Sequence, residues 1–180
     1  MPQLKPATWA ELPRQGPRVK ALCLGINKYD HLEDLANCEQ DAKAMAGKIE
    51  NLAGEQCTAE VHTGIGLKDK AAMREKVLNF VATIDKKAPP RVVIVSYSGH
   101  AIQDGASILM VPSGASAEPD ALKQEGFSHD ELFKILHDEM HQVSTVRVHT
   151  FALIFGAVSC VRRGVVRVRR SILDRHCATQ

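Results

Sequence analysis

Residues 91–112 read RVVIVSYSGHAIQDGASILMVP, and this stretch decides the fold that the sequence predicts. Residues 92–95 form a short apolar run, rich in β-branched side chains and preceded by two prolines, which predicts a buried strand. The bulky side chains then stop at Ser98-Gly99-His100. In an open α/β sheet, chemistry takes place just beyond the carboxyl ends of the strands. His100 is therefore the first candidate for a catalytic residue.

Strand and helix patterns alternate on both sides of this run. The segments that predict further strands are residues 19–26, 57–62, 107–111 and 146–155. Apolar residues recur every three or four positions in residues 34–52 and 73–84, which predicts two helices, the first capped by Asp34 and ended by Gly54. Ser128 and Glu131 form a capping box that predicts the start of another helix.

The resulting order predicts an α/β fold with a mostly parallel central sheet and helices on both faces. We expect the first and third major strands to lie side by side, with His100 at the carboxyl end of the third. Residues 114–126 show no periodicity, so we expect a surface loop there.

Composition narrows the class of protein and its surroundings. The chain has 180 residues, 44% hydrophobic and 24% charged, with a net charge of +2, as in an ordinary globular domain. No apolar stretch is long enough to cross a membrane. The cysteines show no Cys-x-x-Cys spacing, and His137 and His141 lack a third ligand, so we expect no metal and no cofactor. Reduced thiols favour the cytoplasm.

Both ends of the chain differ from its middle. Residues 1–18 contain four of the eight prolines, so we expect an N-terminal leader followed by a domain over residues 19–160. Residues 161–180 form a basic tail with six arginines. A basic edge strand, a nucleic-acid contact and an altered reading frame would each account for this tail. Because it lacks aromatic residues and a known binding module, we expect no nucleic-acid partner.

Two segments carry a resemblance to a known family. Residues 91–112, together with residues 22–45 (LCLGINKYDHLEDLANCEQDAKAM), resemble the caspase-like cysteine peptidases, particularly the metacaspase-type and prokaryotic members. The likeness covers roughly residues 20–140. It implies a three-layer α/β fold, the large-subunit or p20-like domain, and cysteine-type endopeptidase activity on protein or peptide substrates. A small-subunit, p10-like chain is the further partner that it implies.

The resemblance also implies a set of site residues. His100 matches the catalytic histidine of the family's Ser-Gly-His-Gly motif, and Cys160, sixty residues later, is the candidate nucleophile. Ala101 replaces the glycine whose amide helps to form the oxyanion hole, so the expected oxyanion donors are the amides of Ala101 and Cys160. Val158 stands where the family has aspartate. Cys177, near the end of the chain, is the weaker alternative nucleophile.

Asp41 follows Cys38 by three residues, a spacing that resembles the acidic P1 pocket of metacaspase-type members. This position implies cleavage after Arg or Lys rather than Asp, although a solvated helix carboxylate explains the same residue. No calcium-binding loop is evident. A second hypothesis is a catalytically degenerate caspase-like domain that acts as a binding or regulatory module. The unfamiliar residues around Cys160 favour this alternative as much as the enzyme.

Overall fold

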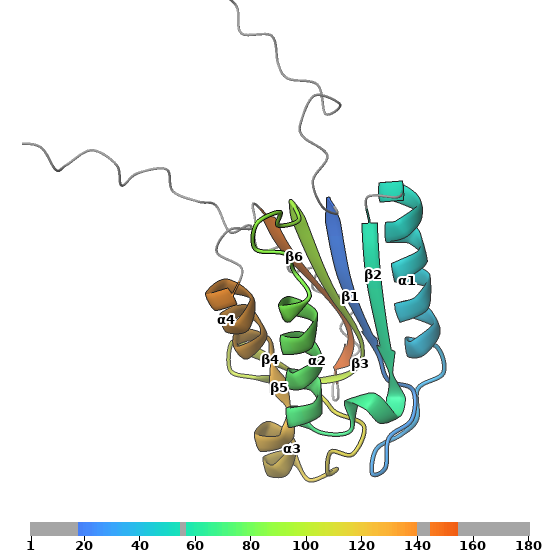
Figure 1. Cartoon of the computed structure of the whole chain (residues 1–180). Helices are drawn as coiled ribbons and strands as arrows, with labels where there is room; N and C mark the ends of the chain where they lie inside the picture. The colour runs from blue at the N-terminus through green and yellow to red at the C-terminus, as the bar shows by residue number, and fades with distance from the viewer. Residues whose placement is uncertain (1–17, 55–56, 140–144, 155–180) are drawn as a thin grey trace, which may run out of the picture.

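The computed structural model describes residues 18–54, 57–139 and 145–154, in which helices cover both faces of a six-stranded sheet (Figure 1). The strands are β1 (Val19–Gly25), β2 (Cys57–Thr63), β3 (Val92–Asp104), β4 (Ser107–Met110), β5 (Phe127–Ser128) and β6 (Thr145–Ile154). The helices are α1 (Cys38–Ala53), α2 (Lys70–Ala82), α3 (Pro119–Glu125) and α4 (His129–Glu139), with a 3₁₀ helix, η2 (Gly64–Leu67), before α2.

The sheet has the order β2-β1-β3-β4-β5, and β6 also pairs with β3. β1 is parallel to both β2 and β3, and β6 is parallel to β3, whereas β4 and β5 pair antiparallel. The predicted α/β fold with a mostly parallel sheet is therefore confirmed. The predicted neighbourhood of the first and third major strands is also confirmed, because β1 and β3 pair directly.

β3 is the longest strand and organises the sheet. Its 13 residues continue beyond Ser98-Gly99-His100, where we expected the strand to end. Small side chains do not interrupt a backbone ladder, and β6 pairs with β3 as far as Ala101. The strand then turns into β4 at Asp104-Gly105, where Gly105 has a φ of 58°.

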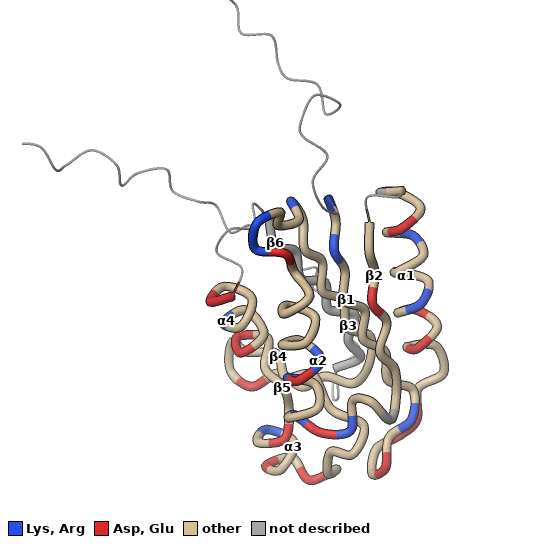
Figure 2. The backbone as a smooth tube through the Cα atoms, in the orientation of Figure 1, with Lys and Arg blue, Asp and Glu red and all other residues tan. Residues whose placement is uncertain are grey.

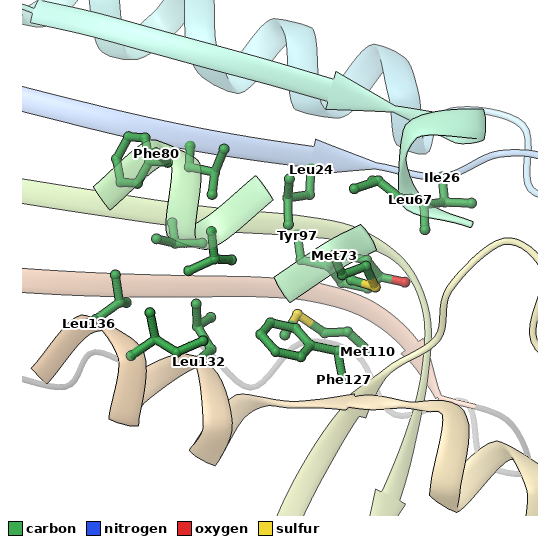
Figure 3. Packing of buried hydrophobic residues seen from close by; sticks show 14 of the residues in the cluster. Leu24, Ile26, Leu67, Met73, Phe80, Tyr97, Met110, Phe127, Leu132 and Leu136 are labelled. Carbon is green, nitrogen blue, oxygen red and sulfur yellow. The ribbon is translucent and has the colours of Figure 1, made fainter. Parts of the chain in front are cut away.

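Two hydrophobic clusters occupy the two faces of the sheet. Figure 3 shows the larger cluster, where bulky side chains of the strands pack against Phe80 of α2 and Leu132 of α4. The cluster under α1 consists mainly of small residues: Ala21, Cys23, Ala42, Ala46 and Ile49. Because successive strand residues point to opposite faces, β1 supplies both clusters. The small residues allow α1 to lie close to the sheet.

The first helix begins four residues later than predicted. α1 starts at Cys38, and Asp34 lies in the preceding loop, where its carboxylate accepts hydrogen bonds from Tyr29 N (3.1 Å) and Lys28 Nζ (2.6 Å). The side chain of Asn27 caps the helix from a distance, since its Oδ1 accepts a bond from Glu39 N at 3.1 Å. The predicted end at Gly54 is confirmed by a C-cap with a φ of 60°.

The predicted surface loop over residues 114–126 is wrong, because α3 lies within it. Pro119 stands in the first turn, where its missing N–H costs no hydrogen bond. Leu122 is the buried residue of this helix. A helix of seven residues with one buried position leaves no periodic pattern for sequence reasoning to detect.

The capping residue of α4 is confirmed. Ser128 Oγ accepts a hydrogen bond from Glu131 N at 3.0 Å, and Phe127 and Leu132 on either side of this cap are both buried. The carboxylate of Glu131 lies 3.3 Å from both Lys70 Nζ and Arg74 Nε, so this residue links α4 to α2.

Charged residues lie mainly along the helices and loops, as Figure 2 shows, and β3 carries none before Asp104. Over the part of the chain that the structure describes, no helix combines the length and apolar character needed to cross a bilayer. The proline-rich segment up to residue 17 and the basic tail lie outside the described residues, so their boundaries stay predictions.

Gly25 is the tightest point between β1 and α1. A Cβ atom there would lie 2.5 Å from Cys38 O and 2.9 Å from Ala42 Cβ. We predict that Gly25→Ala lowers the free energy of unfolding by about 1–3 kcal/mol, because backbone must move to relieve the overlap. Urea unfolding of the full chain measures this change.

Gly47, in the middle of α1, is the matched control for this substitution. A Cβ atom there would meet no heavy atom within 4 Å. Gly47→Ala should raise stability by about 0.5–1 kcal/mol, since alanine restricts the unfolded chain and favours helix. Equal effects of the two substitutions would contradict the proposed packing of α1 on Gly25.

Capping by Asn27 gives a second prediction. Its Nδ2 also donates to Ala36 O at 3.3 Å, so Asn27→Ala removes two bonds at the start of α1 and should cost about 1 kcal/mol of unfolding free energy. Asn37, the residue in the N-cap position, makes no capping bond with its side chain. Asn37→Ala should therefore change stability by less than about 0.5 kcal/mol, and a larger loss than for Asn27→Ala would refute the assignment.

Candidate active site

His100 lies where β3 continues beyond its partner β1. The β1–β3 pairing ends at Gly25 and Ser98, and Ile26 N donates a last hydrogen bond to Ser98 O at 3.0 Å. The pairing with β4 begins at Ala101. Gly99 and His100 thus lie between two pairing partners and face the loop that joins β1 to α1.

That loop contacts the imidazole ring of His100. The ring is buried, with 5% of the residue exposed, and its centroid lies 4.6 Å from that of the Tyr29 ring at an interplanar angle of 54°. His100 Nε2 lies 2.7 Å from the carbonyl oxygen of Glu33. A carbonyl oxygen can only accept, so this contact assigns the proton to Nε2. In the neutral ring, Nδ1 is then the nitrogen that can take up a proton.

The close surroundings of Gly99 explain why the residue before His100 is a glycine. A Cβ atom at this position would lie 2.7 Å from both Tyr29 Oη and Tyr97 Cζ. Side chains do not tolerate such distances, so the two tyrosine rings can approach the strand only because residue 99 has no side chain. The Ser-Gly-His sequence is therefore a packing requirement of this site as well as a motif.

Cys38 and Asp41 lie on the same face of the sheet as His100. Residues two apart in a strand point to one face, so Ser98 and His100 share a side of β3. Ser98 Oγ donates to Asp41 Oδ2 at 3.4 Å. Burial raises the pKa of the Cys38 thiol, and its hydrogen bond with Ser98 opposes this increase only in part. Asp41 itself is exposed.

The remaining predicted site residues divide into two groups. Ala101 lies within β3 in extended backbone, fully buried, so the steric cost that alanine would carry at a positive φ does not arise. Its amide as an oxyanion donor stays a prediction. Cys160, Cys177 and Val158 lie outside the described residues. His100 and Ala101 follow one another within β3, and Asp41 contacts Ser98, two residues before His100.

His137 and His141 are the pair of candidate metal ligands in the sequence. Within residues 18–54, 57–139 and 145–154, no group of three His, Cys, Asp or Glu side chains is arranged to hold a metal ion. His141, the second histidine of the i, i+4 pair, is not among the described residues. The expected absence of a metal stays a prediction.

Sequence reasoning did not identify Tyr29 or Glu33 as part of the site. Both lie in the loop after β1, at the carboxyl edge of the sheet where function is expected in α/β folds. That rule applied to His100 would also have pointed to this loop. The contribution of Glu33 is a backbone carbonyl, however, and no residue type signals it.

Comparison with known proteins agrees with this geometry. The Caspase domain family matches residues 18–154, a range that holds every described element and ends six residues before Cys160. A search of curated proteins finds no match to the chain. The family match confirms the resemblance seen in the sequence and agrees with the caspase-like α/β fold. The chain belongs to the caspase domain family of cysteine peptidases.

Proposed function

We propose that the chain is the p20-like domain of a metacaspase-type cysteine endopeptidase, with His100 and Cys160 as its catalytic dyad. The observation that carries the proposal is the anchoring of the His100 ring. Glu33 O holds Nε2 at 2.7 Å, which orients Nδ1 as the base and leaves the carbonyl to stabilise the imidazolium once it forms. A histidine that only packs in the core would not need to lie beside the loop at the carboxyl end of β1.

The proposed reaction proceeds in two steps. His100 Nδ1 takes the proton of the Cys160 thiol, and the thiolate attacks the carbonyl carbon of the scissile peptide bond. The C–N bond breaks as Nδ1 returns the proton to the leaving amine, which leaves a thioester on Cys160. Water then attacks the thioester, Nδ1 again accepts and returns a proton, and the carboxylic acid product leaves.

Chain geometry supports Cys160 as the nucleophile. β6 runs parallel to β3 and ends with Ile154 opposite Ala101, next to His100. Cys160 lies six positions after Ile154, a length of chain that reaches at most about 20 Å. The amides of Ala101 and Cys160 complete the proposal as oxyanion donors, which stabilise charge that develops on the carbonyl oxygen.

Asp41 is the proposed recognition group for a basic side chain before the scissile bond. It is exposed, so a substrate can reach it, and Ser98 Oγ holds its Oδ2 on the face of β3 that carries His100. A solvated carboxylate on the first turn of a helix is the competing interpretation. Cleavage after Arg or Lys distinguishes the two.

The remaining parts of the proposal concern the chain around this site. We assign residues 1–18 to a leader, 19–160 to the domain and 161–180 to the tail. A p10-like chain would supply the rest of the substrate groove, and neither metal nor cofactor takes part. Reduced thiols are the default state in the cytosol, which favours a cytoplasmic location.

A second candidate function is a degenerate caspase-like module that binds without hydrolysis. The observation in its favour is the sequence around Cys160, where Val158 and Val161 replace the polar and charged residues of the family motif. This module would keep the fold and the anchored His100 but lack turnover.

Thiol reactivity tests the dyad without a substrate. Burial raises the pKa of Cys23, Cys38 and Cys57, so these thiols should react slowly with iodoacetamide at neutral pH. We predict faster alkylation of Cys160, and a slower rate at this residue in His100→Ala. Mass spectrometry of tryptic peptides gives each rate. Slow labelling of Cys160 at the same rate in both proteins would remove it from the site.

Turnover tests the function itself. We predict weak cleavage of fluorogenic peptides that end in Arg or Lys. The residues around Cys160 differ from the family motif, and a nucleophile misplaced by 1 Å costs on the order of a hundredfold in rate. Addition of a p10-like chain should raise the activity. Cys160→Ser and His100→Ala should abolish it, and Asp41→Asn should raise KM for basic substrates.

The same assay separates the competing interpretations. Strong cleavage after Asp would refute the specificity assigned to Asp41. Activity that survives Cys160→Ser would mean that another thiol is the nucleophile. No turnover, even with the complementing chain, would favour the binding module.

A further inference from the structure

We propose that Tyr29 is a positioning residue that keeps His100 Nε2 on the carbonyl of Glu33, an inference that rests on the proposed function of His100. Tyr29 touches His100 twice. Its hydroxyl oxygen accepts a hydrogen bond from His100 N at 2.9 Å, and its ring lies against the imidazole at 4.6 Å. One side chain thus contacts both the backbone and the ring of the residue.

The hydrogen bond from His100 N to the Tyr29 hydroxyl replaces a bond that β1 no longer provides at this position. β1 ends its pairing at Gly25, so the N–H of His100 lies beyond the ladder with β1 and needs another acceptor in this buried region. The Tyr29 hydroxyl supplies that acceptor. On the other side of the residue, His100 O lies 2.8 Å from Tyr97 Oη and accepts a bond from Val111 N at 3.0 Å. Hydroxyl groups therefore hold both backbone polar groups of His100.

The two tyrosines are linked and remain neutral. A hydrogen bond joins their side chains, and burial raises the pKa of Tyr29 to about 12 and that of Tyr97 well above its usual range. Each hydroxyl therefore keeps its proton at physiological pH and can donate and accept at once. This pair is able to hold one arrangement over the whole pH range in which His100 would act as a base.

Tyr29 is itself fixed by the loop that carries it. Tyr29 N donates to Asp34 Oδ1 at 3.1 Å, and Asp30 N donates to Ser113 O at 2.8 Å. Glu33 precedes Asp34 in the same loop, so the hydroxyl that holds the His100 backbone and the carbonyl that holds its ring move together. A shift of Tyr29 should therefore alter the ring contact with Glu33.

The test compares the ring tautomer of His100 in the full chain labelled with ¹⁵N-histidine. Long-range ¹H–¹⁵N spectra identify the ring nitrogen that carries the proton, and His100→Gln assigns the signal. We expect the Nε2–H form to dominate in the unsubstituted protein. In Tyr29→Phe, which keeps the ring and removes only the hydroxyl, the ratio of the Nδ1–H to the Nε2–H form should rise about fivefold.

Val77→Ala is the matched control, because Val77 is fully buried in α2 on the opposite face of the sheet. It should lower stability without a change in the His100 tautomer. An unchanged tautomer ratio in Tyr29→Phe, or an equal change in Val77→Ala, would overturn the proposal. Should Tyr29→Phe fail to fold, Asp34→Ala removes the bond to Tyr29 N instead and should shift the ratio in the same direction. An unchanged ratio in that variant would equally overturn it.

This design separates the positioning role from the proposed function. The tautomer is measured without a substrate, so a protein with no turnover still shows whether Tyr29 positions the ring. Where turnover is measurable, Tyr29→Phe should lower kcat about tenfold with KM unchanged, since the buried hydroxyl bonds to the backbone of His100. An unchanged kcat would contradict the positioning role even if the proposed function is correct.

Discussion

The candidate site exists because two paired strands stop pairing before one of them ends. β1 leaves β3 after Gly25 and Ser98, while β3 continues along β6 to Ala101. Buried backbone groups need partners, so the N–H and C=O of the next residues must bond to something other than β1. Tyr29 Oη and Val111 N take these roles at His100. The hydrogen bonds that β1 would have made to β3 are thus replaced by bonds to a tyrosine side chain and to the residue after β4. These bonds fix the position of a candidate catalytic side chain.

The site also depends on the small size of the side chains packed between α1 and the sheet. On the face of α2 and α4 the interior is filled by large side chains such as Phe80 and Leu132 (Figure 3). Under α1 the residues are small, and Gly25 touches the backbone of Cys38. This thin layer brings the first turn of α1 to the end of β3, where Ser98 bonds to Asp41. A larger residue at Gly25 would displace the candidate recognition group from the candidate base.

Sequence reasoning succeeded where a structural feature has its own pattern. The buried run before Ser98, the apolar faces of α1 and α2 and the cap at Ser128 all follow local rules. It failed where the cause is remote or carries no residue signature. Asn27 caps α1 across 12 positions, α3 buries one residue, and Glu33 acts through its carbonyl. Such contacts arise from the fold, so they become visible only when the loop is seen against β3.

Cys38 is the thiol of α1 on the face of the sheet that carries His100, which Cys23 and Cys57 share, yet its surroundings suit packing rather than nucleophilic attack. The nucleophile in cysteine peptidases is the thiolate, which a low pKa favours. Burial raises the pKa of Cys38, and the negative charges of Asp41 and Glu39 raise it further. With 7% of the residue exposed, a substrate carbonyl has no room to approach. These surroundings support our proposal that the thiol activated by His100 comes from the chain after Ile154, where β6 ends beside the histidine.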